Sequence, residues 1–130
     1  RRDYIYVDDL INLAILVQKT KGFDCVNVSS NQNYSVNEMY DITRQIMNKD
    51  IPATYTDTGN YWCKYPELYE GAFPIRNEIL EHEVNKYSLC DNTLAREKYG
   101  WVPLVDMKQG LKNVVEYIVQ LLSTKVGTNR

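Results

Sequence analysis

The chain has 130 residues, 44% of them apolar and 25% charged, with a formal net charge of -2. These values are ordinary for about one globular domain, and the weak negative charge argues against a nucleic-acid partner. No apolar run approaches the roughly 20 residues of a membrane span. Neither a signal peptide nor an initiator Met opens the sequence, so we expect a cytoplasmic segment from within a longer protein.

The three cysteines are widely spaced, and no Cys/His cluster with metal-ligand spacing accompanies them. We therefore expect reduced thiols and no metal site. Cys63 follows Trp62 and precedes Lys64, and it is the one candidate for a reactive thiol.

An aromatic and β-branched run over residues 4–7 predicts an extended strand near the start of the chain. Arg2 would sit at the base of this strand, where its guanidinium is suited to bidentate contact with a phosphate or carboxylate. Pairing with Asp3, or simple solvation, is the alternative role for this side chain.

A helix is predicted over residues 9–19, with Asp8 or Asp9 as its cap and a wide apolar face that would be covered on more than one side. Gly22 is placed to end this helix. The apolar residues 25–28 then predict a short strand, which makes an α/β pattern of strand, helix and strand.

Ser35 and Glu38 have the spacing of a capping box, and apolar residues at helical spacing continue to Met47. We interpret that stripe as core packing, and Pro52 blocks further helix. Residues 53–56 predict a short edge strand.

Residues 57–87 have no periodicity, are interrupted by Gly and Pro, and are rich in aromatic residues. This composition predicts a long, ordered binding loop with a helical turn over Ile75–Glu83. His82, the sole histidine, is interpreted as a solvated residue.

The C-terminal third predicts a short strand over residues 86–89 and two helices. Asp91 is expected to cap the first helix, which Gly100 would end. Asp106 and Gln109 form a second capping box, at the head of a long helix with a buried apolar stripe that reaches Leu122. The polar residues 123–130 are expected to fray.

Five of these stretches resemble, in register, the C-terminal part of the NAD-dependent epimerase/dehydratase family, the extended short-chain dehydrogenases that act on nucleotide sugars. The stretches are Arg2–Asp9 (RDYIYVDD), Phe23–Ser30, Ser35–Glu38, Asp91–Pro103 and Asp106–Tyr117. The resemblance implies an α/β class, α+β in the isolated fragment, with several amphipathic helices and a few short strands from an extended Rossmann-type enzyme. It also implies a single substrate-binding domain over residues 1–122.

By the same resemblance, the full-length parent is an enzyme that uses NAD(P), and this portion holds the nucleotide diphosphate of the sugar substrate. Arg2 is the expected phosphate contact, with Tyr4 in support. The family's Arg-x-Gly-Asp-like loop is absent here, and Arg76, the only arginine in residues 57–87, is the candidate replacement. Asn27 and Ser29 lie at the end of a predicted strand, where α/β folds place clefts, although Ser29 replaces the family's usual glycine.

The two catalytic parts of the family have no counterpart in these 130 residues. The six glycines lack the spacing of a dinucleotide-binding turn, and none of the eleven tyrosines has a lysine four residues later. We therefore expect no catalytic or cofactor-binding residues and an inactive fragment, which pairs with its own N-terminal Rossmann domain.

Two interpretations from other classes stay open. One is a non-catalytic binding or regulatory protein on the same fold. The other is a free-standing interaction module, and a homodimer is a further possible assembly. The sequence does not identify the nucleotide base, the sugar, or the choice between epimerisation, dehydration and reduction.

Overall fold

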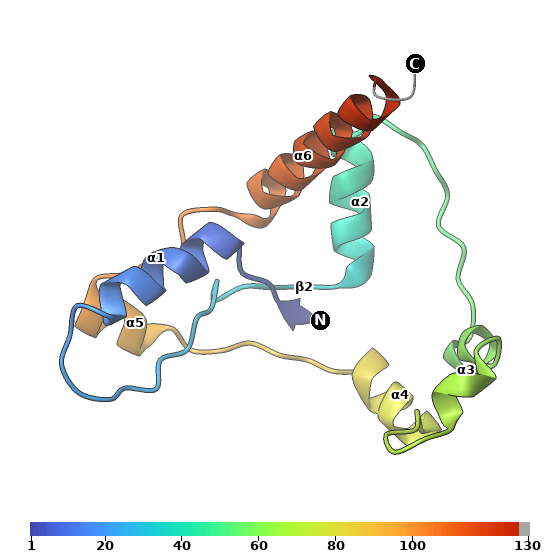
Figure 1. Cartoon of the computed structure of the whole chain (residues 1–130), viewed down its shortest axis with the longest axis horizontal. Helices are drawn as coiled ribbons and strands as arrows, with labels where there is room; N and C mark the ends of the chain where they lie inside the picture. The colour runs from blue at the N-terminus through green and yellow to red at the C-terminus, as the bar shows by residue number, and fades with distance from the viewer. Residues whose placement is uncertain (128–130) are drawn as a thin grey trace. The chain divides into compact units, whose positions relative to one another are not determined.

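The computed structural model describes the backbone of residues 1–127, with the side chains of residues 1–57 and 59–124 (Figure 1). The chain divides into two compact units. The first combines Arg1–Asp50 with the residues from Ser88 onward, and the second is Ile51–Tyr87.

The described residues are mostly helical, with one small antiparallel sheet in which β1 pairs with β2. The elements of the first unit are β1 (Arg2–Asp3), α1 (Val7–Val17), β2 (Asn33–Tyr34), α2 (Val36–Ile46), α5 (Thr93–Tyr99) and α6 (Met107–Gly127). Those of the second are α3 (Thr58–Trp62), the 3-10 helix η1 (Pro66–Tyr69) and α4 (Asn77–Val84). This content agrees with an α+β fragment, and the Rossmann-type arrangement stays a prediction.

The opening strand is shorter than predicted, and the cap of the helix after it is different. Only Arg2–Asp3 forms a ladder, because β2 offers two residues for pairing. Helix α1 begins at Val7, and Tyr6 occupies its N-cap position without a side-chain cap. The predicted capping role of Asp9 is wrong, because its carboxylate accepts backbone hydrogen bonds from a segment far along the chain.

Three other predicted strands are absent from the part of the chain that the structure describes. Residues 25–28, 53–56 and 86–89 have no ladder partner, and an extended segment without a neighbour has no hydrogen bonds to define it as a strand. Gly22 is also not the helix cap: α1 ends at Val17, and Gly22, with a φ of 104°, lies in the turn beyond.

The local helix signals are largely confirmed. Ser35 and Glu38 form a complete capping box, with Glu38 N donating to Ser35 Oγ at 3.1 Å. Gly100 ends α5 in the left-handed conformation, with a φ of 63°. Asp91 acts one residue before the cap position, where its carboxylate accepts from Thr93 N at 2.8 Å. Half of the second capping box forms, through Gln109 N and Asp106 Oδ1 at 2.8 Å.

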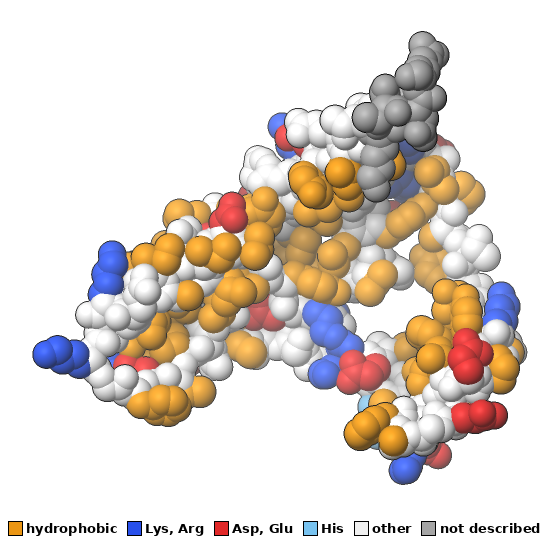
Figure 2. Space-filling view, in the orientation of Figure 1, with side chains coloured by type: hydrophobic (Ala, Val, Ile, Leu, Met, Phe, Trp, Pro, Cys, Tyr) orange, Lys and Arg blue, Asp and Glu red, His pale blue; other side chains and the backbone are white. Residues whose placement is uncertain are grey.

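The core of the first unit is small. Among the described apolar residues only Leu13, Ala95 and Trp101 are fully buried. The predicted covering of α1 and of the α6 stripe is wrong within the described residues, since Ile11 is 48% and Leu122 57% exposed. Hydrophobic side chains lie on the visible surface of this unit (Figure 2). Exposed apolar faces of this kind are typical of interaction surfaces.

The second unit corrects the expectation of one long loop. Residues 57–87 contain α3, η1 and α4, and the predicted helical turn is confirmed as α4. Rings of Tyr61, Trp62 and Tyr65 cluster there, with centroids 5.2 Å apart for Tyr61 and Trp62. Aromatic packing therefore gives this glycine- and proline-interrupted segment its order.

No helix in the described part of the chain is both long enough and apolar enough to cross a membrane. The acidic, His and Cys side chains of the described residues also form no group suited to a metal ion.

Candidate substrate site

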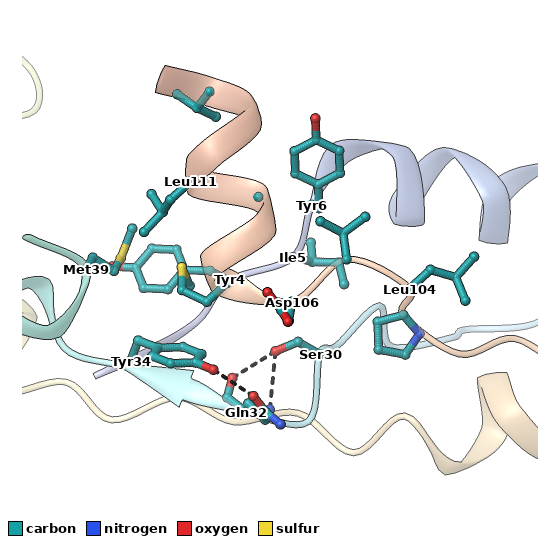
Figure 3. Close-up of a pocket in the computed structure, with 15 residues that line it drawn as sticks. Tyr4, Ile5, Tyr6, Ser30, Gln32, Tyr34, Met39, Leu104, Asp106 and Leu111 are labelled. Carbon is teal, nitrogen blue, oxygen red and sulfur yellow. Dashed lines mark hydrogen bonds between the residues drawn. The ribbon is translucent and has the colours of Figure 1, made fainter. Parts of the chain in front are cut away.

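A cavity of about 290 Å³ lies in the first unit, between the segment after β1, the β2–α2 region and the start of α6 (Figure 3). Its polar lining residues are Tyr4, Tyr6, Ser30, Gln32, Tyr34 and Asp106. Its apolar walls include Ile5, Met39, Leu104, Leu111 and Val114. Aromatic and aliphatic walls with a few converging polar groups are typical of small-molecule sites.

The charge of the lining is unusual for a phosphate site. No lysine, arginine or histidine is among the described residues that line the cavity, and Asp106 is its one carboxylate. A doubly charged diphosphate inside this space would meet no cation and one like charge. The cavity itself is therefore suited to an uncharged group.

Hydrogen bonds hold three of the polar side chains of the cavity in place. The Tyr34 hydroxyl donates to Gln32 Oε1 at 2.7 Å, and Asn113 Nδ2 donates to the Tyr6 hydroxyl at 3.3 Å. The first bond leaves the Gln32 amide nitrogen as the donor end of that side chain. The polar rim is thus partly ordered before any ligand arrives.

Asp106 combines a structural contact with an available acceptor. One carboxylate oxygen accepts from Gln109 N at 2.8 Å, at the first turn of α6. Within the described residues, the other oxygen accepts no hydrogen bond. Figure 3 shows Asp106 and Ser30 pointing toward one another, beside the rings of Tyr4 and Tyr34.

The structure brings two of the three predicted site residues together. Arg2 is the register partner of Tyr34 in the β1–β2 pair, and directly opposed residues in an antiparallel pair project on the same face. Tyr4, two residues further along an extended chain, belongs to that face and lines the cavity. Arg2 is therefore beside the cavity without lining it. Arg76 lies in the second unit, just before α4, and its part in a phosphate clamp stays a prediction.

Asp3, on the opposite face from Arg2, anchors this strand to two other segments. Its carboxylate accepts from the Ser29 hydroxyl, from Ser30 N at 3.0 Å and from Cys90 N at 3.2 Å. Burial alone would raise the pKa of Asp3, but the hydrogen bonds from Ser29 and Ser30 outweigh it and hold the pKa below its ordinary value. These hydrogen bonds fix the chain at Asp3 and thereby position its two neighbours, Arg2 and Tyr4.

The other two candidates, Asn27 and Ser29, are engaged in structural contacts. Ser29 is fully buried, and its hydroxyl is occupied by Asp3. Asn27 donates to the Asp91 carbonyl at 3.2 Å. From the sequence alone, Asp3 was considered only as a possible partner of Arg2. No local pattern in the Ser29-Ser30 pair predicts a hydrogen bond to a carboxylate 26 residues away.

We expect the Asp3 anchor to weaken in acid. The pKa of Asp3 is depressed in the folded chain, so its contribution to stability is present above the unfolded-state pKa and disappears as the pH falls through the folded-state pKa. The gap in unfolding free energy between the wild type and Asp3→Asn should be widest above about pH 5 and should narrow toward pH 3. Urea denaturation across this range measures the gap, with Asp8→Asn as an exposed-carboxylate control. A gap that is constant with pH would contradict the anchor.

Comparisons with known proteins point to one enzyme class at low identity. The chain is 26% identical to GDP-mannose 3,5-epimerase 1 of rice over 85% of its own length and 23% of that protein. It is 25% identical to a putative UDP-glucose 4-epimerase of Methanocaldococcus jannaschii, over 90% of the chain and 30% of that protein. An uncharacterized protein of Sinorhizobium fredii, y4nL, is 24% identical over 92% of the chain and 37% of its own length.

The chain therefore resembles the C-terminal part of nucleotide-sugar epimerases, and it spans about a quarter to a third of the curated relatives it matches. No family model matches it. No solved structure matches it either.

Proposed function

We propose that this chain is the substrate-binding portion of an NAD-dependent nucleotide-sugar epimerase or dehydratase and holds the nucleotide diphosphate of the sugar. The observation that carries the proposal is the register of Arg2 opposite Tyr34, because Tyr34 and Tyr4 both line the aromatic cavity. The similarity to epimerases of two nucleotide-sugar classes supports it.

In this proposal each site residue has a separate role. The Arg2 guanidinium makes bidentate hydrogen bonds to the diphosphate, as its planar donor geometry allows. Tyr4 packs against the bound nucleotide from the cavity wall. Residues of this chain bind and orient the substrate, whereas NAD(P) belongs to an N-terminal Rossmann domain of the parent and supplies the hydride chemistry there.

The exposed apolar faces of α1 and α6 support a partner of this kind. In α1 the exposed apolar side chains Val7, Leu10, Ile11 and Ile15 recur at helical spacing. A nucleotide-binding domain of the same protein packed on this face would bury that surface.

Thermal melting of the chain with UDP-, dTDP-, GDP- and CDP-sugars tests the proposal. A ligand at about 100 times its dissociation constant should stabilise the fold by about 2.7 kcal/mol, a measurable rise in Tm. Arg2→Ala should weaken binding at least about tenfold, because a hydrogen bond to a charged group contributes about 1.5–3 kcal/mol.

Two variants sharpen this result. Arg2→Lys keeps the charge but loses the bidentate geometry, so an intermediate affinity is expected. Arg96→Ala removes an exposed arginine from α5 and should leave the affinity unchanged. If no nucleotide sugar shifts the Tm of this chain or of its full-length parent, the proposal is wrong.

A free-standing interaction module is the second candidate, and the same exposed apolar faces favour it. Sedimentation velocity of the chain distinguishes the two. Self-association together with no response to any nucleotide sugar would favour the module, whereas a ligand-induced Tm shift would favour the substrate-binding portion.

A further inference from the structure

We infer that the cavity beside Arg2 receives the nucleobase of the substrate and that its polar groups select guanine. This inference rests on the proposed function and names the substrate class for the same site. It assigns roles to Asp106 and Gln32, which no sequence motif singled out as ligand contacts.

The size and charge of the cavity determine which part of a nucleotide sugar fits. At about 290 Å³ it is slightly smaller than the usual range for ligand pockets, about 300–1,000 Å³, so it holds one ring system rather than a whole nucleotide sugar. The described lining contains no cation, so the diphosphate stays outside, next to Arg2. The sugar must reach a cofactor that this chain does not hold, which leaves the base as the group inside.

The walls of the cavity suit a flat heterocycle. Tyr4 and Tyr34 present aromatic rings along one side of it (Figure 3), and bases stack favourably on such rings. Met39 and Leu111 add apolar surface from α2 and α6. Stacking of this kind does not distinguish one base from another, so the choice of base depends on the polar groups.

The polar groups present one acceptor pair and one donor. The Asp106 carboxylate has an oxygen that accepts no hydrogen bond among the described residues, while its other oxygen retains a second lone pair beyond the bond from Gln109 N. Gln32 uses its carbonyl oxygen for Tyr34 and leaves its amide N–H groups as donors. Guanine carries two adjacent donors, N1–H and N2–H, and the acceptor O6 next to them. A carboxylate and an amide therefore complement its edge.

The other bases lack this pattern of adjacent donors. Uracil and thymine carry a single N–H between two carbonyls, so one oxygen of Asp106 would face a carbonyl oxygen. Cytosine and adenine place a ring-nitrogen lone pair beside the amino group and oppose the carboxylate in the same way. Each of these bases would therefore leave a hydrogen-bonding group of Asp106 or Gln32 unpaired, which lowers its affinity relative to guanine.

Isothermal titration of the 130-residue chain with GDP, UDP, dTDP, CDP and ADP tests the inference. We expect GDP to bind at least about tenfold more tightly than the other four. Asp106→Asn should remove most of this preference, because the amide offers one acceptor and places a donor against guanine. Asparagine caps a helix as well as aspartate does, so α6 should remain intact. Asp8→Asn, an exposed position of α1 outside the cavity, is the matched control.

Gln32→Glu is a second variant that does not touch the α6 cap. Glutamate can still accept from the Tyr34 hydroxyl, but it replaces the amide donor with an acceptor that opposes guanine O6. GDP affinity should fall at least about tenfold, with no change in the Tm of the unliganded chain.

The outcomes separate this inference from the proposed function. If UDP or dTDP binds more tightly than GDP, or if both variants keep full GDP affinity, the guanine assignment is wrong and the proposed function stands. If no nucleoside diphosphate binds either the wild-type chain or its full-length parent, both are wrong.

Discussion

Replacing Trp101 with alanine should destabilise the first unit by about 3–5 kcal/mol, the usual cost of removing a buried tryptophan. Trp101 is 3% exposed and is the largest of the three buried apolar residues in the described core. Its indole Nε1 also donates to the Asp9 carbonyl at 3.0 Å, a contact between α1 and the segment after α5. Typical domains have only about 5–15 kcal/mol of stability, so this single change removes a large fraction of it.

Urea denaturation followed by far-UV circular dichroism measures this effect. Trp101→Phe keeps most of the apolar volume but loses the indole N–H, so it should cost about 1–3 kcal/mol, less than the alanine variant. Trp62→Ala, in the second unit, is the matched control and should leave the transition of the first unit in place. A loss below about 1 kcal/mol for Trp101→Ala would show that the core is organised differently.

Replacing Asp9 with alanine should cost about 2–5 kcal/mol, because it leaves two backbone amides of the first unit without their acceptor. Asp9 is 1% exposed, and its two carboxylate oxygens accept from Leu104 N at 3.0 Å and Val105 N at 3.1 Å. Both amides belong to the extended link before α6, so the carboxylate fixes that link to α1. A buried carboxylate that loses such partners is expensive, and so are amides that lose their carboxylate.

The neighbouring residue provides a sharp control for this prediction. Asp8 precedes Asp9 in the same turn of α1 but is exposed, so Asp8→Ala should change the unfolding free energy by no more than about 0.5–1 kcal/mol. Asp9→Asn keeps one acceptor oxygen and should lie between the two. Urea denaturation measures both effects. Equal losses of unfolding free energy at the two positions would show that the hydrogen bonds from Leu104 N and Val105 N to Asp9 do not stabilise the fold.

Helix boundaries were predictable from the sequence where they depend on residues a few positions apart. The capping box of Ser35 and Glu38 is confirmed because both of its hydrogen bonds close within one turn. Gly100 ends α5 for a similarly local reason, since a left-handed residue at that point needs no Cβ. These signals are independent of the rest of the fold.

Strands and burial were much less predictable. Residues 4–7 and 25–28, which alternate β-branched residues with others, have the composition of strands, but a strand also needs a neighbour with free backbone groups. Only Asn33–Tyr34 supplies one, so the ladder is short and includes Arg2. Asp9 fits a capping pattern locally, yet its partners lie 95 and 96 residues away. No local pattern contains that information.

The sequence by itself determined the positions of the main helices and the resemblance to the C-terminal part of nucleotide-sugar epimerases. The roles of Arg2 and Tyr4 as site residues stay a prediction from the sequence. The tertiary structure alone decided that Tyr34 stands opposite Arg2 and that Asp106 faces the same cavity as Tyr4. The physical reason is the range of the interactions. Capping and helical periodicity act within a turn or two. The walls of the cavity come from segments about 30 and 100 residues apart, which are brought together only when β1 pairs with β2 and α2 packs against α6.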